Sequence, residues 1–279
     1  MAAAQSEVDR AQGVASCHLH DDIEVGDVVE ARAPAGAFWL DPAAATPVVL
    51  IGGGIGVTPL ISMLNAITEA GSSRTVWFLY GVRDSADHVM ADHLRSLADR
   101  HPSLSIHVCY SQPEPGAMPG AGFQHAGRID MDLIRRVVVD LSIPHFYLCG
   151  PSSMMQSLTA GLAAAGVGAA RIHHEAFGPA SVKGTSGSAA RTEVPNGVEV
   201  HFLRSKRRLP WDGSATILDL AEREGIAIES GCRAGNCGSC AAVVRSGQFA
   251  YPVAPGAEVP AGSCLTCVAT PLSALELDA

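Results

Sequence analysis

Three closely spaced cysteines could bind a metal in this chain of 279 residues. Cys232, Cys237 and Cys240 follow the spacing C-x4-C-x2-C in the stretch CRAGNCGSC, and Cys264 and Cys267 come later. Thiolate sulfur is a ligand of both zinc and iron–sulfur clusters. The first three cysteines together with one later cysteine fit the spacing of a [2Fe–2S] site. The small residues of the loop would also let backbone N–H groups approach the sulfurs closely.

A zinc site is the alternative for the same cysteines. It would use two C-x2-C pairs, Cys237 with Cys240 and Cys264 with Cys267. This assignment leaves Cys232 without a role, and it places 23 residues between the pairs, somewhat more than is usual in a zinc knuckle. A reduced loop without metal is a third interpretation. The spacing favours the iron–sulfur cluster.

A second candidate site is the glycine loop in VVLIGGGIGVTP, which ends an apolar strand and opens a helix. The N–H groups and the dipole at a helix N-terminus favour a phosphate. No three of these glycines fit G-x-G-x-x-G, so the loop is not a Rossmann fingerprint. On the residues alone, it is either a nucleotide-binding loop or a structural glycine turn.

The elements that position this loop alternate between strand and helix up to residue 177. We expect strands at TPVVLIGGG, TVWFLYG, LSIHVCYS and HFYLCGP, followed by helices at residues 57–71, 88–100, 130–139 and 154–166. In the first helix, Thr58 is the expected N-cap, Pro59 the first helical residue and Gly71 the end. Such alternation predicts an α/β fold with a doubly wound parallel sheet.

The chain changes character after residue 178. The Gly- and Pro-rich stretch GPASVKGTSGSAARTEVPNG is typical of a flexible linker. Beyond it, VEVHFLRS alternates as a half-solvated strand does, TILDLAEREG predicts a short helix, and AAVVRSGQFAY and LTCVATP predict further strands. One helix against a small mixed sheet indicates an α+β domain.

The composition of the chain excludes several classes of function. The net charge is −9 and the only basic run is SKRR, which argues against nucleic acid or an anionic membrane as a general partner. No apolar run reaches the roughly 18–20 residues of a membrane helix. The polar N-terminus lacks the pattern of a signal peptide, so we expect a cytoplasmic protein. In that compartment the eight cysteines indicate metal or redox roles rather than disulfides.

The cysteine region resembles a known family. ESGCRAGNCGSC followed by GSCLTCVATP is similar to the plant-type ferredoxin domain, a β-grasp fold, over residues 197–279. The resemblance implies that Cys267, in the strand motif L-T-C-V, is the fourth ligand beside Cys232, Cys237 and Cys240. Cys264 is then a small buried neighbour.

Residues 45–178 resemble the nicotinamide-binding domain of the ferredoxin–NADP reductase superfamily, through GGGIGVTPLISML, YGVRDSADHVM and YLCGPSSMM. By this likeness the residues that contact the pyrophosphate and the nicotinamide come from two loops. They are Gly54, Gly56, Thr58 and Pro59 in the first loop, and Cys149, Gly150 and Pro151 in the second.

The stretch EAFGP, at residues 175–179, resembles the end of the nucleotide domain in flavohaemoglobin-like and dioxygenase-type reductases. The likeness places Glu175 near the nicotinamide and Phe177 near a flavin. Cys149 and Glu175 are therefore the catalytic candidates, although electron transfer requires no proton-transfer residue here. Read without the family, Phe177 is a core residue near the linker.

The charged residues after the second and third strands indicate whether the coenzyme is NADH or NADPH. A 2′-phosphate needs a cationic cradle, usually with arginine. Arg83 follows the second strand but is flanked by Asp84 and Asp87, and no Lys or Arg follows the third strand. We therefore expect NADH rather than NADPH, with Arg83 among the coenzyme-binding residues.

The two sites together imply a flavin, because nicotinamide gives two electrons at once and a [2Fe–2S] cluster accepts one. Residues 13–40 resemble the last part of the superfamily's flavin-binding barrel, with Ser16 either near the flavin phosphate or a simple N-cap, and GDVVEARAPAGAFWL as closing strands. Such a barrel normally spans about 100 residues. We expect residues 1–44 to be the remnant of a truncated antiparallel barrel, which would retain FMN or FAD poorly.

The predicted order is therefore a barrel remnant at 1–44, a nucleotide domain at 45–178, a linker at 179–196 and a ferredoxin domain at 197–279. This order resembles phthalate dioxygenase reductase-like proteins. It implies a reductase that moves electrons from NADH through flavin and cluster to an oxygenase, a demethylase component or a haem protein. The alternative is a truncated ferredoxin-type carrier that does not oxidise NADH by itself. A zinc-stabilised nucleotide-binding module is a third possibility.

Overall fold

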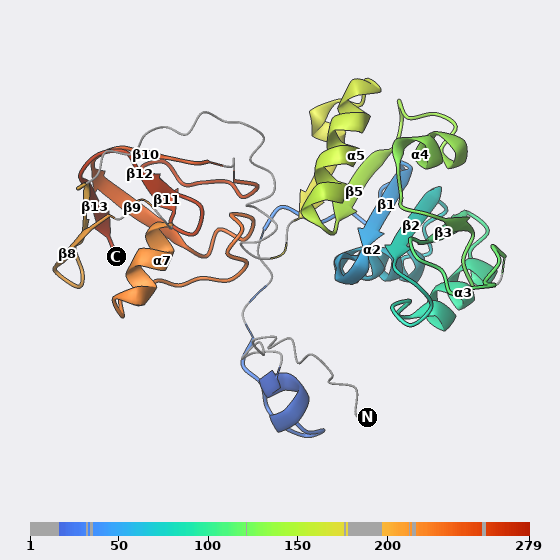
Figure 1. The fold of residues 1–279 in the computed structure, drawn as a ribbon, viewed down its shortest axis with the longest axis horizontal. Helices are drawn as coiled ribbons and strands as arrows, with labels where there is room; N and C mark the ends of the chain where they lie inside the picture. Colours follow the sequence, from blue (N-terminus) through green and yellow to red (C-terminus); the bar gives the residue numbers. More distant parts are fainter. Residues whose placement is uncertain are drawn as a thin grey trace, which may run out of the picture. The chain divides into compact units, whose positions relative to one another are not determined.

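The computed structural model describes residues 17–31, 33, 36–120, 122–175, 177, 197–211, 213, 216–252 and 255–279. The chain divides into two compact units, Met1–Pro34 and Ala35–Ala279. Figure 1 shows the α/β part of the second unit in blue to yellow-green and its β-rich part in orange and red. Ser16 and the predicted linker at 179–196 lie outside the described residues.

Six parallel strands form the larger sheet, in the order β4-β3-β2-β1-β5-β6. They are β1 (Val48–Gly53), β2 (Val76–Val82), β3 (Leu104–Tyr110), β4 (His125–Ala126), β5 (His145–Cys149) and β6 (Ile172–Glu175). The chain moves outward from β1 to β4 and then crosses to β5 on the other side of β1. The predicted doubly wound sheet is thus confirmed, with its reversal between β1 and β5.

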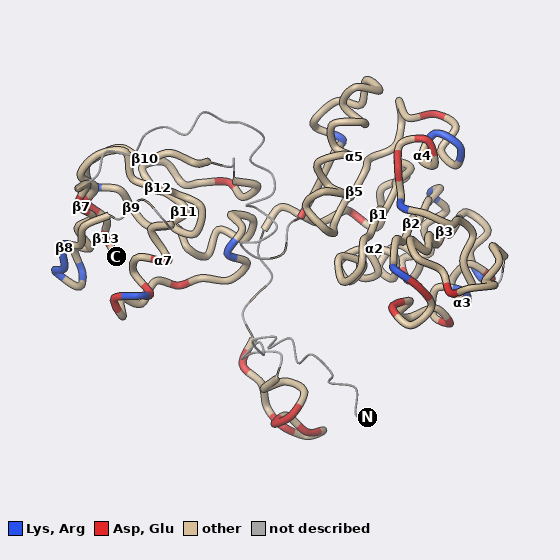
Figure 2. The backbone as a smooth tube through the Cα atoms, viewed as in Figure 1, with Lys and Arg blue, Asp and Glu red and all other residues tan. Residues whose placement is uncertain are grey.

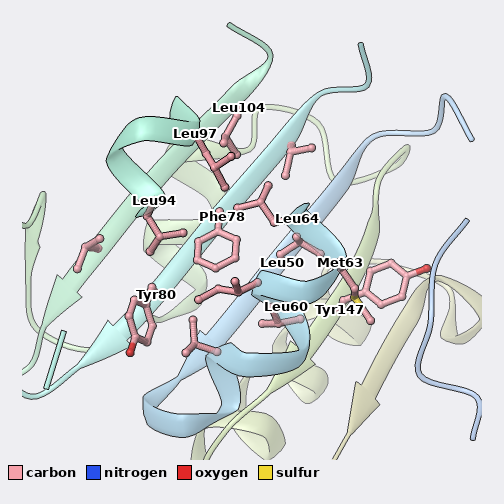
Figure 3. Packing of buried hydrophobic residues seen from close by; sticks show 14 of the residues in the cluster. Leu50, Leu60, Met63, Leu64, Phe78, Tyr80, Leu94, Leu97, Leu104 and Tyr147 are labelled. Carbon is pink, nitrogen blue, oxygen red and sulfur yellow. The ribbon is translucent and has the colours of Figure 1, made fainter. Parts of the chain in front are cut away.

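Helices cover both faces of this sheet, because successive residues of each buried strand point to opposite sides. Helices α2 (Val57–Glu69) and α3 (Ala91–Arg100) pack with Leu50 and Phe78 on one face. Figure 3 shows Phe78 between Leu94 and Leu97 of α3 and Leu64 of α2. Helices α4 (Met131–Val137) and α5 (Ser152–Ala164) cover Val49, Ile51 and Leu79 on the other face. A 3-10 turn, η3 (Ala169–Arg171), precedes β6.

The start of α2 differs from the prediction. A 3-10 turn, η2 (Gly54–Gly56), leads directly into the helix, so Gly56 is the N-cap and carries no side-chain cap. Thr58 is already helical and its hydroxyl donates to the Ile55 carbonyl at 3.0 Å. The assignment of Thr58 as N-cap and Pro59 as first helical residue was therefore wrong. Gly71, at φ +64°, does end the helix, as predicted.

The β-rich part is a five-stranded mixed sheet in the order β11-β9-β13-β7-β8, and it confirms the predicted α+β arrangement. Its strands are β7 (Glu199–Phe202), β8 (Arg207–Pro210), β9 (Ala241–Ser246), β11 (Ser263–Leu265) and β13 (Leu275–Asp278). Helix α7 (Ile217–Arg223) begins at a capping box of Thr216 and Asp219 and packs Ile217, Leu220 and Ala221 into the sheet core. A separate pair joins β10 (Phe249–Ala250) to β12 (Thr270–Pro271).

The predicted strand LTCVATP is interrupted. Strand β11 ends at Leu265, and the Val268 and Ala269 amides both donate back to the Leu265 carbonyl, at 3.1 and 3.0 Å. These bonds close a turn over residues 266–268. Cys267 therefore lies in a turn between two strands rather than in a strand.

The first unit contains the short π-helix η1 (His18–Asp22). In the described residues before Val48 there is no strand, so the predicted closing strands within 26–40 are not formed. Val28 and Val29 are exposed, and a strand needs a neighbour to satisfy its N–H and C=O groups. Figure 2 shows acidic but no basic residues on this described segment.

No helix among the described ranges combines the length and the apolarity that crossing a membrane requires.

Candidate nucleotide and iron–sulfur sites

The glycine loop lies at the point where the strand order reverses. Strands β1 and β5 run side by side there, with Gly52 in register with Cys149. A Cβ on Gly56 would overlap the Cys149 carbonyl, and one on Gly53 would lie 2.8 Å from Cδ of Pro151. The loops after β1 and β5 therefore pack main chain against main chain, which only glycine allows. Crevices at such reversals are where open α/β sheets bind ligands.

The same loop suits a phosphate. Gly54 has φ +53°, and a Cβ placed on it would meet no atom within 4 Å, so its outer side is open. Helix α2 starts three residues later, at Val57, without a side-chain cap. The Val57 amide already donates to the carbonyls of Gly54 and Ile55, and the dipole of the uncapped helix end adds attraction for an anion.

Cys149 and Glu175 lie at the carboxyl ends of β5 and β6, in register with each other. Cys149 is fully buried, and burial raises the pKa of its thiol to about 12, with the Glu175 charge adding to the effect. Burial also raises the pKa of Glu175. Cys149 is therefore a neutral thiol rather than a reactive thiolate. Phe177 follows two residues later with 41% of its surface exposed.

A cavity of about 280 Å³ adjoins the glycine loop on the β2 side. Its lining is Gly54, Ile55, Tyr80, Val82, Arg83, Asp87 and Val89. Arg83 Nε lies 3.1 Å from Asp84 Oδ2 and 3.7 Å from Asp87 Oδ2. The sequence indicated Arg83 but not Tyr80 or the wall of the cavity, because the seven lining residues come from the glycine loop, from β2 and from the loop after it and meet only in the fold.

The cysteine loop directs backbone amides at sulfur. Cys232 Sγ accepts from the amides of Ala234, Asn236 and Cys237, at 3.4, 3.2 and 3.3 Å. Cys237 Sγ accepts from the Cys232 amide at 3.3 Å. Positive φ at Gly235 and Gly238 permits this tight path. Such donors stabilise negative charge on sulfur, so the residues present fit an iron–sulfur cluster.

The four predicted ligands form two pairs. Cys232 and Cys237 interact within the loop, and a hydrogen bond joins the thiols of Cys240 and Cys267, which lowers the pKa of Cys240 and raises that of Cys267. Across the described part of the chain, no three His, Cys, Asp or Glu side chains converge on a single ion. Two thiol pairs instead match a two-iron cluster with two protein ligands on each iron.

Cys264 is placed differently from Cys267. It is fully buried in β11, in register with Ala242, and belongs to the core between the sheet and α7. Burial raises the pKa of its thiol to about 12. Cys267 instead packs with Cys240, Leu265 and Val268. The structure therefore places Cys267, and not Cys264, in the group of buried side chains that contains Cys240.

Two side chains beside the cysteines were not predicted. The buried Thr266 hydroxyl donates to the Cys240 carbonyl at 3.0 Å, and the Tyr251 hydroxyl accepts from the Leu265 amide at 3.0 Å. Both fix the turn that carries Cys267. No spacing or period in the sequence marks them, because each acts across more than ten residues.

Comparison with known proteins gives two domain matches. Residues 50–159 match the oxidoreductase NAD-binding domain, and residues 200–272 match the 2Fe-2S iron-sulfur cluster binding domain. The chain is 38% identical over 167 residues to a flavohemoprotein of Rhizobium meliloti, a match that covers 60% of this chain and 41% of the relative. The chain thus spans less than half the length of that relative.

Two solved structures extend the comparison. The flavohem-like FAD/NAD-binding domain of a nitric oxide dioxygenase from Vibrio cholerae superposes with a TM-score of 0.51 at 32% identity, over 60% of this chain and 65% of that one. An intact type IV self-sufficient cytochrome P450 monooxygenase superposes with a TM-score of 0.60 at 22% identity. The second match covers 97% of this chain and 32% of that one, and it shows a shared fold.

Proposed function

We propose that this chain, which joins an oxidoreductase NAD-binding domain of the ferredoxin–NADP reductase superfamily to a 2Fe-2S cluster-binding domain, carries electrons from NADH through a flavin to the cluster and on to a partner protein. The observation that carries the proposal is that one chain holds both a nucleotide crevice at a sheet reversal and two cysteine pairs in an amide-rich loop. An electron donor site and a one-electron acceptor site together define a reductase component.

At the nucleotide site the main chain does most of the binding. The amides of Gly54, Gly56 and Thr58 and the positive end of α2 face the pyrophosphate, and Pro59 lies beside them. Gly150 and Pro151 close the opposite wall of the crevice. Pro59 and Pro151 have no N–H to donate, so their contribution is shape.

Cys149 and Glu175 face the nicotinamide end of the crevice in this proposal. Burial raises the pKa of both side chains, as expected where water is partly excluded. Their role is to orient the nicotinamide ring and to exclude water, so that the coenzyme does not lose its hydride in side reactions. Arg83 serves the other half of the coenzyme.

Cys232, Cys237, Cys240 and Cys267 are the proposed ligands of the cluster, which supplies one-electron chemistry when bound. The amides directed at Cys232 and Cys237 hold negative charge on those sulfurs. Thr266 and Tyr251 hold the turn that brings Cys267 to Cys240.

A flavin links the two sites, since it exchanges electrons with nicotinamide in pairs and with a cluster singly. Phe177 and Ser16 are the candidate flavin contacts in this chain, with FMN and FAD both allowed. The flavohemoprotein relative carries flavin in its name, which supports this step. Its haem likewise favours a haem protein among the candidate acceptors, beside an oxygenase or a demethylase component.

The proposed location is the cytoplasm. None of the eight cysteines, all of which lie in the described residues, forms a disulfide. Free thiols and thiolate-bound clusters persist in reducing compartments.

The test is anaerobic reduction of the reconstituted chain. The chain is loaded with iron and sulfide, FMN or FAD is added and its binding measured, and NADH is then titrated in while the visible absorption of the cluster is recorded. Loss of that absorption supports the reductase. Reduction by dithionite but not by NADH, with flavin bound, would instead support the carrier function.

A further inference from the structure

A second cavity lies at the edge of the six-stranded sheet opposite to the glycine loop. Its volume is about 340 Å³, within the range of small-molecule pockets. It is lined by residues near the amino ends of β1, β5 and β6, whereas the glycine loop follows the carboxyl end of β1. None of its lining residues takes part in the proposed coenzyme or cluster sites. The lining includes Trp39, Asp41, Arg74, His145, Tyr147 and His173.

Arg74 is a buried cation in this lining, with only 4% of its surface exposed. Its guanidinium bonds to main-chain carbonyls: Nη2 donates to Asp41 at 2.8 Å, and both Nε and Nη2 donate to Ala44. Among the described contacts, Nη1 makes no hydrogen bond and the side chain forms no ion pair. A buried charge without a counter-ion is unfavourable, and an anion bound beside it would offset the cost.

Asp41 is the only acid in the lining, and it does not neutralise Arg74 directly. Its carboxylate is exposed and accepts from the Ala43 amide at 2.9 Å. Its charge acts on Arg74 from a distance and raises the guanidinium pKa only in part against the larger lowering effect of burial. Asp41 therefore lies on the rim of the cavity, while the cation lies inside.

Flat rings form another part of the wall. His173 stacks with His145 and with Tyr147, at centroid distances of 5.2 and 4.5 Å and interplanar angles of 10° and 17°. His145 Nδ1 and His173 Nε2 lie 2.9 Å apart in a hydrogen bond. Burial lowers the pKa of both histidines, so the pair is uncharged at neutral pH. Trp39 adds an indole that is 67% exposed. Such a wall favours a ligand with a flat ring.

The Tyr147 hydroxyl is a second donor near the guanidinium. Tyr147 belongs to the buried core, and Figure 3 shows its hydroxyl pointing away from the other labelled residues. Burial raises the pKa of Tyr147, and the Arg74 charge opposes this rise. The hydroxyl and the guanidinium are therefore close enough to act on the same anion.

We propose that this cavity binds a small aromatic carboxylate, with its carboxylate held by Arg74 and the Tyr147 hydroxyl and its ring packed on Trp39 and His173. The planar guanidinium matches the two oxygens of a carboxylate. The volume suits a ligand with one ring, and the Asp41 charge on the rim disfavours a second negative charge. This site is separate from electron transfer and goes beyond the proposed function.

The test is calorimetric titration of the full chain with benzoate, benzamide and benzamidine. These probes share one ring and carry a charge of −1, 0 and +1. We expect benzoate to bind at least about tenfold more tightly than benzamide, as for one charge-assisted hydrogen bond, and benzamidine to bind most weakly. Cyclohexanecarboxylate keeps the charge without the flat ring, and should bind about threefold more weakly than benzoate.

Variants assign the effect to residues. Arg74→Gln should weaken benzoate binding at least about tenfold. Arg171→Gln is the matched control, because Arg171 also donates to two main-chain carbonyls, of Leu141 and Pro144 at 2.9 Å, but does not line the cavity. It should bind benzoate as wild type does. Trp39→Ala changes an exposed side chain and should weaken benzoate about threefold with an unchanged melting temperature.

Several results would overturn the proposal. They are no benzoate binding by wild type, equal binding of benzoate and benzamide, or tighter binding of benzamidine. Undiminished benzoate binding by a folded Arg74→Gln would do the same. If Arg74→Gln does not fold, the probe series and Trp39→Ala decide, and an unchanged benzoate affinity in Trp39→Ala overturns the assigned position of the ring.

Discussion

The nucleotide domain and the ferredoxin domain build their sites from different material. In the nucleotide domain the crevice is main chain, formed where β1 and β5 end and held by a sheet buried on both faces. In the ferredoxin domain the proposed site is four cysteine side chains in a loop and a turn, outside regular strands. Folding of the nucleotide domain is enough to form the first site. The second is a set of ligands that a cluster must complete, so cluster binding contributes to the stability of its own domain.

The sharpest test of this difference is to remove one ligand. Cys267→Ala should reduce bound iron from about two per chain to near zero, and should lower the melting temperature of the ferredoxin domain, because binding free energy is folding free energy there. Iron analysis and thermal unfolding report the two effects.

Cys264→Ala is the matched control. It lies in the core of the same domain, so it should cost about 1 kcal/mol of stability by leaving a small void while iron stays bound. If Cys264→Ala lost iron and Cys267→Ala kept it, the assignment of ligands would be reversed.

Because the nucleotide crevice is formed by main chain, a substitution at one of its glycines should disrupt it. Gly56→Ala places a methyl group on the Cys149 carbonyl, so one of the two loops must move. We expect loss of 5′-AMP binding and roughly 1–3 kcal/mol of lost stability in the nucleotide domain, with full iron content. Calorimetry and denaturant unfolding measure these.

Gly168→Ala is the control for Gly56→Ala. Its φ is −65° and a Cβ there meets no atom within 4 Å, so neither binding nor stability should fall. Normal 5′-AMP binding by Gly56→Ala would show that the close approach of the two loops is not needed.

Acidic pH should lower the stability of the nucleotide domain more than that of the ferredoxin domain. Two histidine pairs bridge its strands, His107 with His125 at 3.2 Å and His145 with His173 at 2.9 Å. Burial lowers the pKa of all four, and nearby charges add to this, including Arg171 and Arg74 near His145. The unfolded chain, with histidine pKa values near 6.5, therefore binds protons that the folded domain excludes.

The direction of the pH dependence follows from the linkage between proton binding and folding. A lowered pKa in the folded state contributes stability that is present above about 6.5 and is lost as the pH falls toward the folded value. We expect the nucleotide domain to melt several degrees lower near pH 5.5 than near pH 7.5. His107→Gln with His145→Gln should weaken this dependence, and equal melting temperatures at both pH values in wild type would contradict it.

The smallest effect concerns α7 in the ferredoxin domain. Its capping box joins the Asp219 amide to the Thr216 hydroxyl at 3.2 Å and the Thr216 amide to the Asp219 carboxylate at 3.0 Å. Thr216→Ala should cost about 1 kcal/mol in denaturant unfolding, and Thr216→Ser should cost little. A loss of iron in Thr216→Ala would mean that the helix holds the cluster loop more directly than its position suggests.

The sequence predicted the parts of the fold that depend on local pattern. The apolar runs that became β1, β2, β3 and β5 were recognisable because strands buried on both faces are continuously hydrophobic. The helix end at Gly71 and the helix at residues 217–223 were visible from their punctuation. Cys232, Cys237 and Cys240 stood out because a cluster requires its ligands close together.

The predictions were wrong where the local structure depends on residues that are distant in the sequence. The N-cap at Thr58 was displaced because the glycines before it form a 3-10 turn that already starts the helix. Cys267 was expected in a strand, but bonds to the Leu265 carbonyl fold that stretch into a turn. The expected strands at 26–40 have no partner within the described residues. The hydrogen bond from the Ser85 amide to Glu114 could not be predicted, because these residues meet only through the loops after two adjacent strands.

The most direct measurement of the central claim is an anaerobic NADH titration of the reconstituted chain with flavin bound, followed in the visible region and by electron paramagnetic resonance. We expect NADH to bleach the cluster absorption and to produce the rhombic signal of a reduced [2Fe–2S] cluster, and we expect Cys267→Ala to show neither change. An unchanged cluster spectrum, with both NADH and flavin shown to be bound, would contradict it.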